Sequence, residues 1–277
     1  MVLNLSNEDV VVQHDLHAKS SFRCTCTFWI IKLLTLALAT LYVLNLAMVP
    51  KTSSVDFDLY IMSMSYQPEF CHKHEDYPGC RKPEPFWKSH LTIHGMWPEY
   101  KDGTWPSFCT TEVLDNATIA PLLSRMEHYW PNVQALTPTA HHFFDFWKHE
   151  WSKHGTCSGL TQLQYFEAAL AHFVNTPSIL ADNYGGTVNK TDLLEAYSNN
   201  GDEADAGNVI LACQAKHWLS NVRICVGVMP NGKATKREPC PSMVISNNSC
   251  VGEVIRIAKF VPSFENTGGG RVRSSEN

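Results

Sequence analysis

The sequence predicts an α+β domain in which a central antiparallel sheet packs against helices and disulfides cross-link the chain. Strand-like patterns lie at both ends of residues 55–264, and helix-like patterns cluster between them. Eight of the ten cysteines also lie in this range, and an even number there indicates a disulfide framework. A chain of 277 residues, 44% of them hydrophobic, is long enough for one sizeable core, so we expect a single domain.

The N-terminal part divides into a polar segment, residues 1–27, and an apolar segment, residues 28–49. The apolar segment is long enough to span a membrane, and Lys19, Arg23 and Lys32 predict that its N-terminal side stays in the cytosol. A cleaved signal peptide is the alternative, and both stay open. Either one sends the domain into the secretory pathway, as a secreted, lysosome- or vacuole-like protein or as the lumenal part of a type II membrane protein.

The strands and loops are expected as follows. Residues 56–66 alternate and predict a strand, whereas residues 70–85, with two cysteines and three prolines, predict a loop. Residues 91–98 predict a short strand that carries His94 at its end, because Gly95 and Pro98 break the alternation. Three further strands are expected at residues 209–211, 222–228 and 254–260, with a polar loop at 198–208 and a disordered tail at 265–277.

Helical periodicity covers residues 118–130, 137–154, 163–174 and 190–197. In the second of these, Thr137 is suited to cap the start and Pro138 to occupy the first helical position. Gly155 is suited to a left-handed conformation that ends the helix. Asn189 or Thr191 is the expected cap of the last helix.

The sequence FWKHEWSKHGTC, residues 146–157, concentrates ionisable groups among aromatic residues. His149, Glu150, Lys153 and His154 occupy less than half of the helix circumference. Charges beside aromatic rings are costly unless something compensates them, although a plain polar helix face is the simpler interpretation for one short segment. The two histidines are spaced i,i+5, roughly 140° apart, rather than at the i,i+4 spacing of a zinc-binding helix, so we expect no metal.

A second segment, IHGMWP at residues 93–98, complements this one. Together, in their order and spacing, the two segments resemble the two active-site signatures of the ribonuclease T2 family. The resemblance covers roughly residues 57–260. Met96 stands where the family usually has leucine, which is a volume-conserving exchange.

The resemblance implies an endoribonuclease that cleaves single-stranded RNA through a 2′,3′-cyclic phosphate, as a monomer and without metal or cofactor. RNA carries its own nucleophile, so the enzyme needs a base, an acid and a cation at the phosphate. The implied catalytic residues are His94, Glu150, Lys153 and His154. The implied substrate-binding residues are His149 at the phosphate, Trp97 and Trp105 as stacking platforms for bases, and Glu99 where some members use aspartate. Core packing is the alternative for the two tryptophans.

The resemblance also implies the disulfide pairs Cys71–Cys80, Cys109–Cys157, Cys213–Cys250 and Cys225–Cys240. Composition alone leaves 105 pairings open. The second pair would join the loop after His94 to the end of the catalytic helix. Three N-x-S/T motifs, at Asn116, Asn189 and Asn247, predict glycosylation of an exported surface.

Two expectations concern the chemistry. The C-terminal end of the helix and Glu150, one turn before His154, should both favour a protonated His154, so we expect an acidic pH optimum. A net charge of −5 excludes a generally basic nucleic-acid-binding surface but not a local basic site. The alternatives are a catalytically inactive binding glycoprotein on the same scaffold and a zinc hydrolase that EDTA would inactivate.

Overall fold

The structure, a computed structural model, describes residues 29–42, 54–135, 140–198 and 209–260. The chain divides into two compact units, Met1–Thr52 and Ser53–Asn277. In the first unit, residues 29–42 form a helix with exposed side chains. Within the described ranges, none of the helices combines the length and the apolar character that a membrane crossing requires. The remainder of the predicted segments 1–27 and 28–49, and the predicted tail 265–277, lie outside the described residues.

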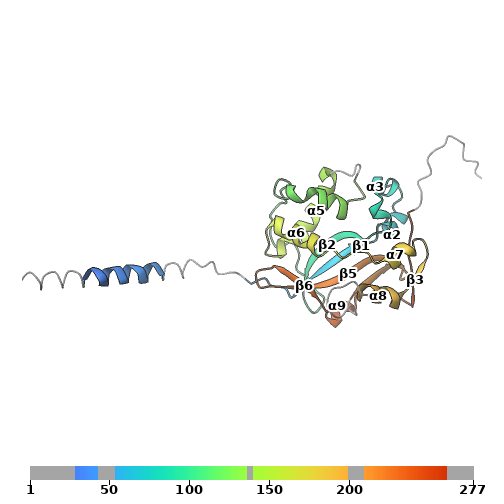
Figure 1. Ribbon diagram of the computed structural model, residues 1–277. Helices are drawn as coiled ribbons and strands as arrows, with labels where there is room; N and C mark the ends of the chain where they lie inside the picture. The colour runs from blue at the N-terminus through green and yellow to red at the C-terminus, as the bar shows by residue number, and fades with distance from the viewer. Residues whose placement is uncertain (1–28, 43–53, 136–139, 199–208, 261–277) are drawn as a thin grey trace, which may run out of the picture. The chain divides into compact units, whose positions relative to one another are not determined.

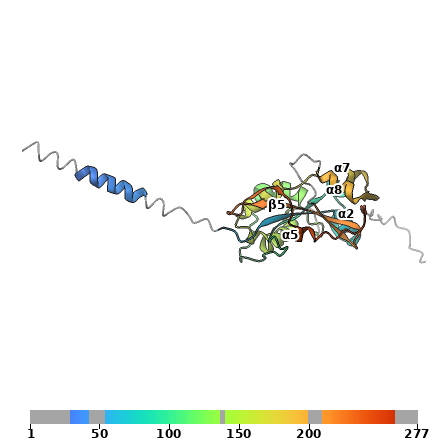
Figure 2. The same ribbon diagram turned by 90° about the horizontal axis from the view of Figure 1, so that it is seen from below.

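A sheet forms the centre of the second unit, where β1 and β5 run side by side (Figures 1 and 2). Its described strands are β1 (Leu59–Ser65), β2 (Thr92–Glu99), β3 (Thr187–Asn189), β4 (Ile210–Gln214), β5 (Trp218–Val228), β6 (Ala234–Glu238) and β7 (Val254–Arg256). The order is β2-β1-β5-β7-β3, and β4 and β6 also pair with β5. All pairs are antiparallel except β5 with β7, so the predicted antiparallel sheet is correct apart from that pair. The short strands β3 and β6 were not predicted.

Helices surround the sheet. Those described in the second unit are α2 (Gln67–His72), α3 (Pro78–Arg81), α4 (Leu123–Tyr129), α5 (Ala140–Lys153), α6 (Gln162–Ala171), α7 (Ser178–Asp182), α8 (Lys190–Ser198) and α9 (Ser242–Ile245). The predicted helices correspond to α4, α5, α6 and α8. The predicted loop 70–85 is wrong in part, because Pro68 and Pro78 stand in the first turns of α2 and α3, where proline is favourable. The predicted cap Thr137, Pro138 and most of the loop 198–208 lie outside the described residues.

Strand β1 separates two hydrophobic cores, because successive side chains point to opposite faces. Tyr60 and Met62 belong to the large core, which the helices α4 to α8 cover. Leu59 and Ile61 belong to a smaller core on the other face, together with Val244 of α9. The face with the smaller core is the one that carries the functional site.

Strand β2 is an edge strand that pairs with β1. The predicted break at Gly95 and Pro98 is therefore wrong: the strand continues to Glu99, since a sheet edge accommodates a proline that cannot donate a hydrogen bond. His94 consequently lies inside the strand rather than at its end.

Side chains donate hydrogen bonds to backbone carbonyls at the outer edge of β2. The carbonyl of His94 accepts a hydrogen bond from Nε1 of Trp130 (2.9 Å), and the carbonyl of Met96 accepts one from the hydroxyl of Tyr165 (2.7 Å). Both donors belong to the large core. These bonds replace the neighbouring strand that an edge lacks and fix the backbone that carries His94.

The end of α5 differs from the prediction. The chain continues from Lys153 into a 3₁₀ turn, Gly155–Cys157, and Gly155 does not have a positive φ. A glycine is required there for a different reason: a Cβ atom would overlap the ring of the buried Trp151. Glycine is therefore required at position 155 by close packing and not by a left-handed backbone conformation.

Among the described residues, four disulfides form in the pairs that the resemblance implies: Cys71–Cys80, Cys109–Cys157, Cys213–Cys250 and Cys225–Cys240. The asparagines of the three predicted glycosylation motifs, Asn116, Asn189 and Asn247, are exposed. Asn189 also caps α8, because its side-chain oxygen accepts a hydrogen bond from the Thr191 N–H (2.8 Å). Glycosylation itself stays a prediction.

Candidate active site

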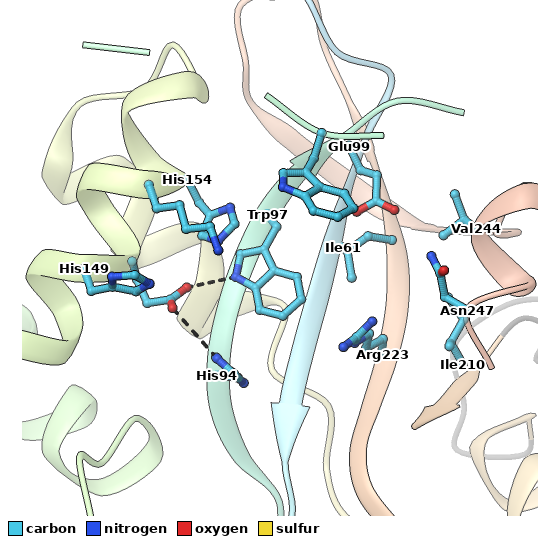
Figure 3. A pocket seen from close by; sticks show the side chains of 13 residues that line it. Ile61, His94, Trp97, Glu99, His149, His154, Ile210, Arg223, Val244 and Asn247 are labelled. Atoms are coloured by element: carbon cyan, nitrogen blue, oxygen red, sulfur yellow. Dashed lines mark hydrogen bonds and ion pairs between the residues drawn. The ribbon is translucent and has the colours of Figure 1, made fainter. Parts of the chain in front are cut away.

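A cleft of about 430 Å³ brings all eight predicted catalytic and substrate-binding residues together (Figure 3). These are His94, Trp97, Glu99, Trp105, His149, Glu150, Lys153 and His154. They come from the edge strand β2, the loop after it and the last turns of α5. Five further lining residues were not predicted from the sequence: Ile61, Ile210, Arg223, Val244 and Asn247.

His94 owes its position to a β-bulge. Ser63 of β1 faces Gly95 and the next residue, Met64, faces Ile93, so His94 is the extra residue of β2. A bulge turns a side chain away from the regular alternation of the strand. Nδ1 of His94 lies 3.3 Å from Oγ of Ser65, which leaves Nε2 directed into the cleft.

Glu150 is the buried carboxyl group of the site, with 1% of the residue exposed. Its Oε2 accepts a hydrogen bond of 2.8 Å from Nε1 of Trp97, and its Oε1 lies 3.9 Å from Nε2 of His94. Gly95 makes this approach possible, because a Cβ atom there would overlap Oε2 of Glu150. The helix α5 and the edge strand β2 therefore meet at this carboxyl group.

His154 packs against the indole of Trp97. The two rings are stacked, with 5.2 Å between centroids and 28° between planes, and the residue is 5% exposed. The ring of His94 lies at the same distance from the indole, edge to face. The two histidines thus share one aromatic neighbour, while Nδ1 of His154 has no hydrogen-bond partner in the described structure.

The expected link between Glu150 and a protonated His154 is wrong. The carboxyl group of Glu150 is directed to Trp97 and His94 instead, and burial lowers the pKa of His154 to about 3, with the charges of Lys153, His149 and His94 acting in the same direction. The position of His154 at the helix end accounts only for local charge. Desolvation by the surrounding protein is larger and disfavours the imidazolium.

Two further ionisable groups of the site, His94 and Glu150, also favour their neutral forms. Burial lowers the pKa of His94 to about 4, aided by the charges of Arg223, His149 and Lys153, although the 38% of the side chain that faces water opposes this effect. Burial raises the pKa of Glu150 to about 8, against the hydrogen bond from Trp97 and the charge of Lys153. At neutral pH the contact of His94 with Glu150 is therefore one between uncharged groups.

Two cationic or polar side chains lie at the cleft entrance, one turn apart on α5. His149 is exposed and Lys153 is half-buried. The carbonyl of Lys153 accepts a hydrogen bond of 3.0 Å from the Phe108 N–H, and the Cys109–Cys157 disulfide lies next to this contact. The end of α5 is thereby fixed to the loop that follows β2. In the described part of the chain, no group of three His, Cys, Asp or Glu residues is arranged to hold a metal ion.

The other end of the cleft contains Glu99, Trp105 and Arg223. Trp105 is 54% exposed, so core packing does not explain it. Glu99 is 6% exposed, and burial raises its pKa to about 7 in spite of the nearby charge of Arg223. Arg223 comes from β5 and lies over the indole of Trp97, 5.3 Å from its centroid. In the sequence, the signal for Arg223 was its position between Val222 and Ile224, which face the large core and leave it on the opposite face.

A smaller cavity of about 150 Å³ lies on the far side of His94. Its polar lining includes Ser65, Gln67 and Gln134, and Phe146 of α5 adds an aromatic wall. Because His94 lines both cavities, the histidine stands between two spaces that each have polar and apolar surface.

Comparisons with known proteins agree with this geometry. The model of the Ribonuclease T2 family matches residues 57–236. Intracellular ribonuclease LX of Solanum lycopersicum is 33% identical over 201 residues, which cover 68% of this chain and 79% of that protein. Extracellular ribonuclease LE of the same plant is 36% identical over 121 residues, 42% of this chain and 50% of that protein. Among solved structures, RNase NT in complex with 5′-AMP is similar, with a TM-score of 0.56, 27% identity and coverage of 74% of this chain and all of that one.

Proposed function

Because the chain belongs to the ribonuclease T2 family and is an RNA-cleaving enzyme, we propose that it cleaves single-stranded RNA by transphosphorylation, without a metal ion. In this reaction the 2′-oxygen of one nucleotide forms a bond to the adjacent phosphorus, and the bond from phosphorus to the 5′-oxygen of the next nucleotide breaks. The products are a 2′,3′-cyclic phosphate and a free 5′-hydroxyl. Hydrolysis of the cyclic phosphate to a 3′-phosphate can follow.

The observation that carries this proposal is the placement of His94 and His154 against one indole, at 5.2 Å each. One imidazole takes the proton of the 2′-hydroxyl and the other gives a proton to the departing 5′-oxygen. A histidine pair can do this because imidazole exchanges a proton under mild conditions. Their lowered pKa values leave both imidazoles neutral near pH 7, so a base is available there and the protonated acid is populated at lower pH.

The remaining residues of the cleft stabilise charge at the phosphate. Lys153 and His149 both line the cleft, which supports a role for them at the phosphate oxygens as negative charge develops. Glu150 acts as a neutral hydrogen-bonding group near His94 in the free enzyme, since its pKa is raised to about 8. Trp105 and Glu99 supply a stacking surface and a polar contact for a base, and Trp97 orients both Glu150 and His154.

The two cavities on either side of His94 support a substrate with a base on each side of the scissile phosphate. Single-stranded RNA meets this requirement, because its unstacked bases can enter separate spaces. A duplex would keep its bases paired and out of reach. We therefore expect cleavage of loops and single strands in preference to double helices.

We further propose that the domain works in an oxidising compartment, secreted or vacuole-like. Its four disulfides support this, because the cytosol keeps cysteines reduced. The matched relatives include one named extracellular and one named intracellular. The monomeric state stays a prediction.

The test is an assay of the purified domain with single-stranded RNA in the presence of EDTA. We expect cleavage with 2′,3′-cyclic phosphate ends, detected by mass spectrometry, and loss of cleavage in His94→Ala. The matched control is His72→Ala, which removes an exposed histidine of α2. Cleavage that stops in EDTA would indicate a metal-dependent hydrolase, and cleavage that survives in His94→Ala would exclude this mechanism.

A further inference from the structure

We propose that Arg223 is a specificity-determining residue that, together with Glu99, selects a guanine base in the cleft. This inference rests on the proposed function, because it assigns the substrate of the same site. The resemblance to known signatures does not include Arg223, which the fold brings in from β5.

Trp97 separates the cleft into two halves. On one side lie His154, stacked on the indole, and the other catalytic groups of α5 (Figure 3). On the other side the guanidinium of Arg223 lies over the same indole at 5.3 Å (Figure 3). We call this second side the Arg223 half; its remaining lining residues are Ile61, Glu99, Ile210, Val244 and Asn247.

The Arg223 half contains a guanidinium and a carboxyl group that influence each other electrostatically without forming an ion pair within 4 Å. Nε of Arg223 is buried and has no hydrogen-bond partner in the described structure. The ion pairs within 4 Å among the described residues are His94–Glu150 and His128–Glu84, so Arg223 and Glu99 remain separate. A buried donor without a partner is costly and is uncommon in native proteins. Both residues line the cleft, and no hydrogen bond within the described residues occupies the side chain of either one.

The surface between the two charges is apolar. Ile61 lies between Arg223 and Glu99 in the close view, and Ile210 and Val244 continue the same surface (Figure 3). The indole of Trp97 forms a wall beside the guanidinium. A flat, aromatic molecule with polar edges matches such a space better than a phosphate, which would leave the apolar surface and the carboxyl group of Glu99 unused.

The polar edges must offer acceptors to Arg223 and donors to Glu99. Guanine presents O6 and N7 as adjacent acceptors, which suit the fork of a guanidinium, and N1–H and N2–H₂ as donors for a carboxyl group. Adenine presents its N6–H₂ donor where guanine has O6, cytosine presents N4–H₂, and uracil has a single N–H donor. Among the RNA bases, guanine alone offers two acceptors to Arg223 and two donors to Glu99.

The test measures kcat/KM for the sixteen dinucleoside monophosphates with wild-type enzyme and with Arg223→Gln. We expect wild type to prefer guanine at one of the two nucleotide positions by roughly 5- to 150-fold in kcat/KM. Arg223→Gln should lose this preference, whereas the ranking of bases at the other nucleotide position should stay as in wild type. Arg223→Lys keeps the charge but loses the planar fork, so its preference should fall as well. Arg125→Gln, on the exposed side of α4, is the control that should change nothing. A ratio between substrates does not depend on the folded fraction of a variant.

The alternative outcomes separate this inference from the proposed function. An equal loss for all sixteen substrates in Arg223→Gln would show a contact to phosphate and would overturn the guanine assignment alone. Absence of a guanine preference in the wild-type enzyme would also overturn the guanine assignment alone. Failure of wild type to cleave any dinucleotide or any polymeric RNA would overturn the proposed function first. As a second measurement on wild type, 5′-GMP should inhibit cleavage more strongly than the other three mononucleotides, and equal inhibition by all four contradicts the assignment.

Discussion

The indole N–H of Trp97 donates a hydrogen bond of 2.8 Å to Oε2 of Glu150. This bond joins the edge strand β2, which carries His94, to the helix α5, which ends directly before His154; these are the two histidines of the proposed mechanism. Because Glu150 is almost completely buried, its protonation state is set by the protein and not by the solvent. Several consequences for stability and catalysis can be measured.

The first prediction concerns the effect of Glu150→Gln on stability. The pKa of Glu150 is raised to about 8 in the folded protein, whereas the unfolded chain ionises near its ordinary value of 4.5. Between these values the unfolded state binds fewer protons, so the contribution of Glu150 to stability decreases as pH rises. Glutamine does not titrate. The urea midpoint of Glu150→Gln should therefore increase relative to wild type from pH 5 to pH 8, and a difference that stays constant would contradict the raised pKa.

The second concerns Gly95→Ala. The added Cβ would overlap Oε2 of Glu150 and crowd Nε1 of Trp97, so the carboxyl group must move. We expect kcat to fall by roughly 10- to 100-fold and stability to decrease by about 1–3 kcal/mol, as in other overpacked sites. Gly186→Ala is the control, since the nearest atom to its Cβ is 3.3 Å away and the position is exposed. Wild-type kcat in Gly95→Ala, measured on single-stranded RNA, would show that the Trp97–Glu150 contact is dispensable.

The third is the pH dependence. Burial lowers the pKa of His94 to about 4 and that of His154 to about 3, and catalysis needs one imidazole neutral and one protonated. In the proposed mechanism the protonated one is lost as pH rises through about 4, so kcat/KM should peak between about pH 3 and 4 and decline above that range. Bound phosphate stabilises an imidazolium, so the kcat profile should lie at higher pH than the kcat/KM profile. A kcat/KM plateau that extends to pH 8 would contradict the lowered pKa values.

The fourth compares two lysines of α5. Lys153 lines the cleft, whereas Lys148 is exposed on the opposite side. Lys153→Ala should lower kcat by roughly 10²- to 10³-fold, because it removes a fixed cation at the phosphate, and Lys148→Ala should not. The charge of Lys153 also lowers the pKa of His154, so its removal should shift the pH–rate profile upward. Equal effects of the two substitutions would exclude a role at the phosphate.

The fifth concerns the Cys109–Cys157 disulfide, which closes a separation of 48 residues. In the chain-entropy relation, the Cys109→Ala/Cys157→Ala variant loses about 4 kcal/mol, and the corresponding Cys71/Cys80 variant, with a separation of 9, about 2.6 kcal/mol. Activity should distinguish them further. At a temperature at which circular dichroism shows both variants folded, the first should lose kcat and the second should keep it. Full turnover of the first variant would refute the role of this disulfide in the site.

Much of the site could be predicted because its residues are neighbours in the sequence. The helix that ends at Lys153 carries His149 and Glu150 at helical spacing, and the strand motif carries His94 and Trp97. Local periodicity is sufficient to place such groups on one face of an element. The disulfide pairs came from the resemblance, since spacing alone does not determine them.

What could not be predicted depends on contacts between distant segments. Arg223 is a single cation in an apolar strand, and only the sheet brings it beside Trp97. The bulge at His94 arises from the register of β1 against β2, which the alternation in one strand does not reveal. The protonation of His154 was misjudged for the same reason, because its burial comes from packing that a helical wheel omits.

The exposed position of Cys109 gives the Cys109–Cys157 bond a consequence beyond rigidity. An exposed disulfide is open to attack by glutathione, which is abundant in the cytosol. Reduction would remove the covalent connection that keeps the end of α5 beside the loop after β2, so we expect a thiol reductant to lower the activity of the enzyme.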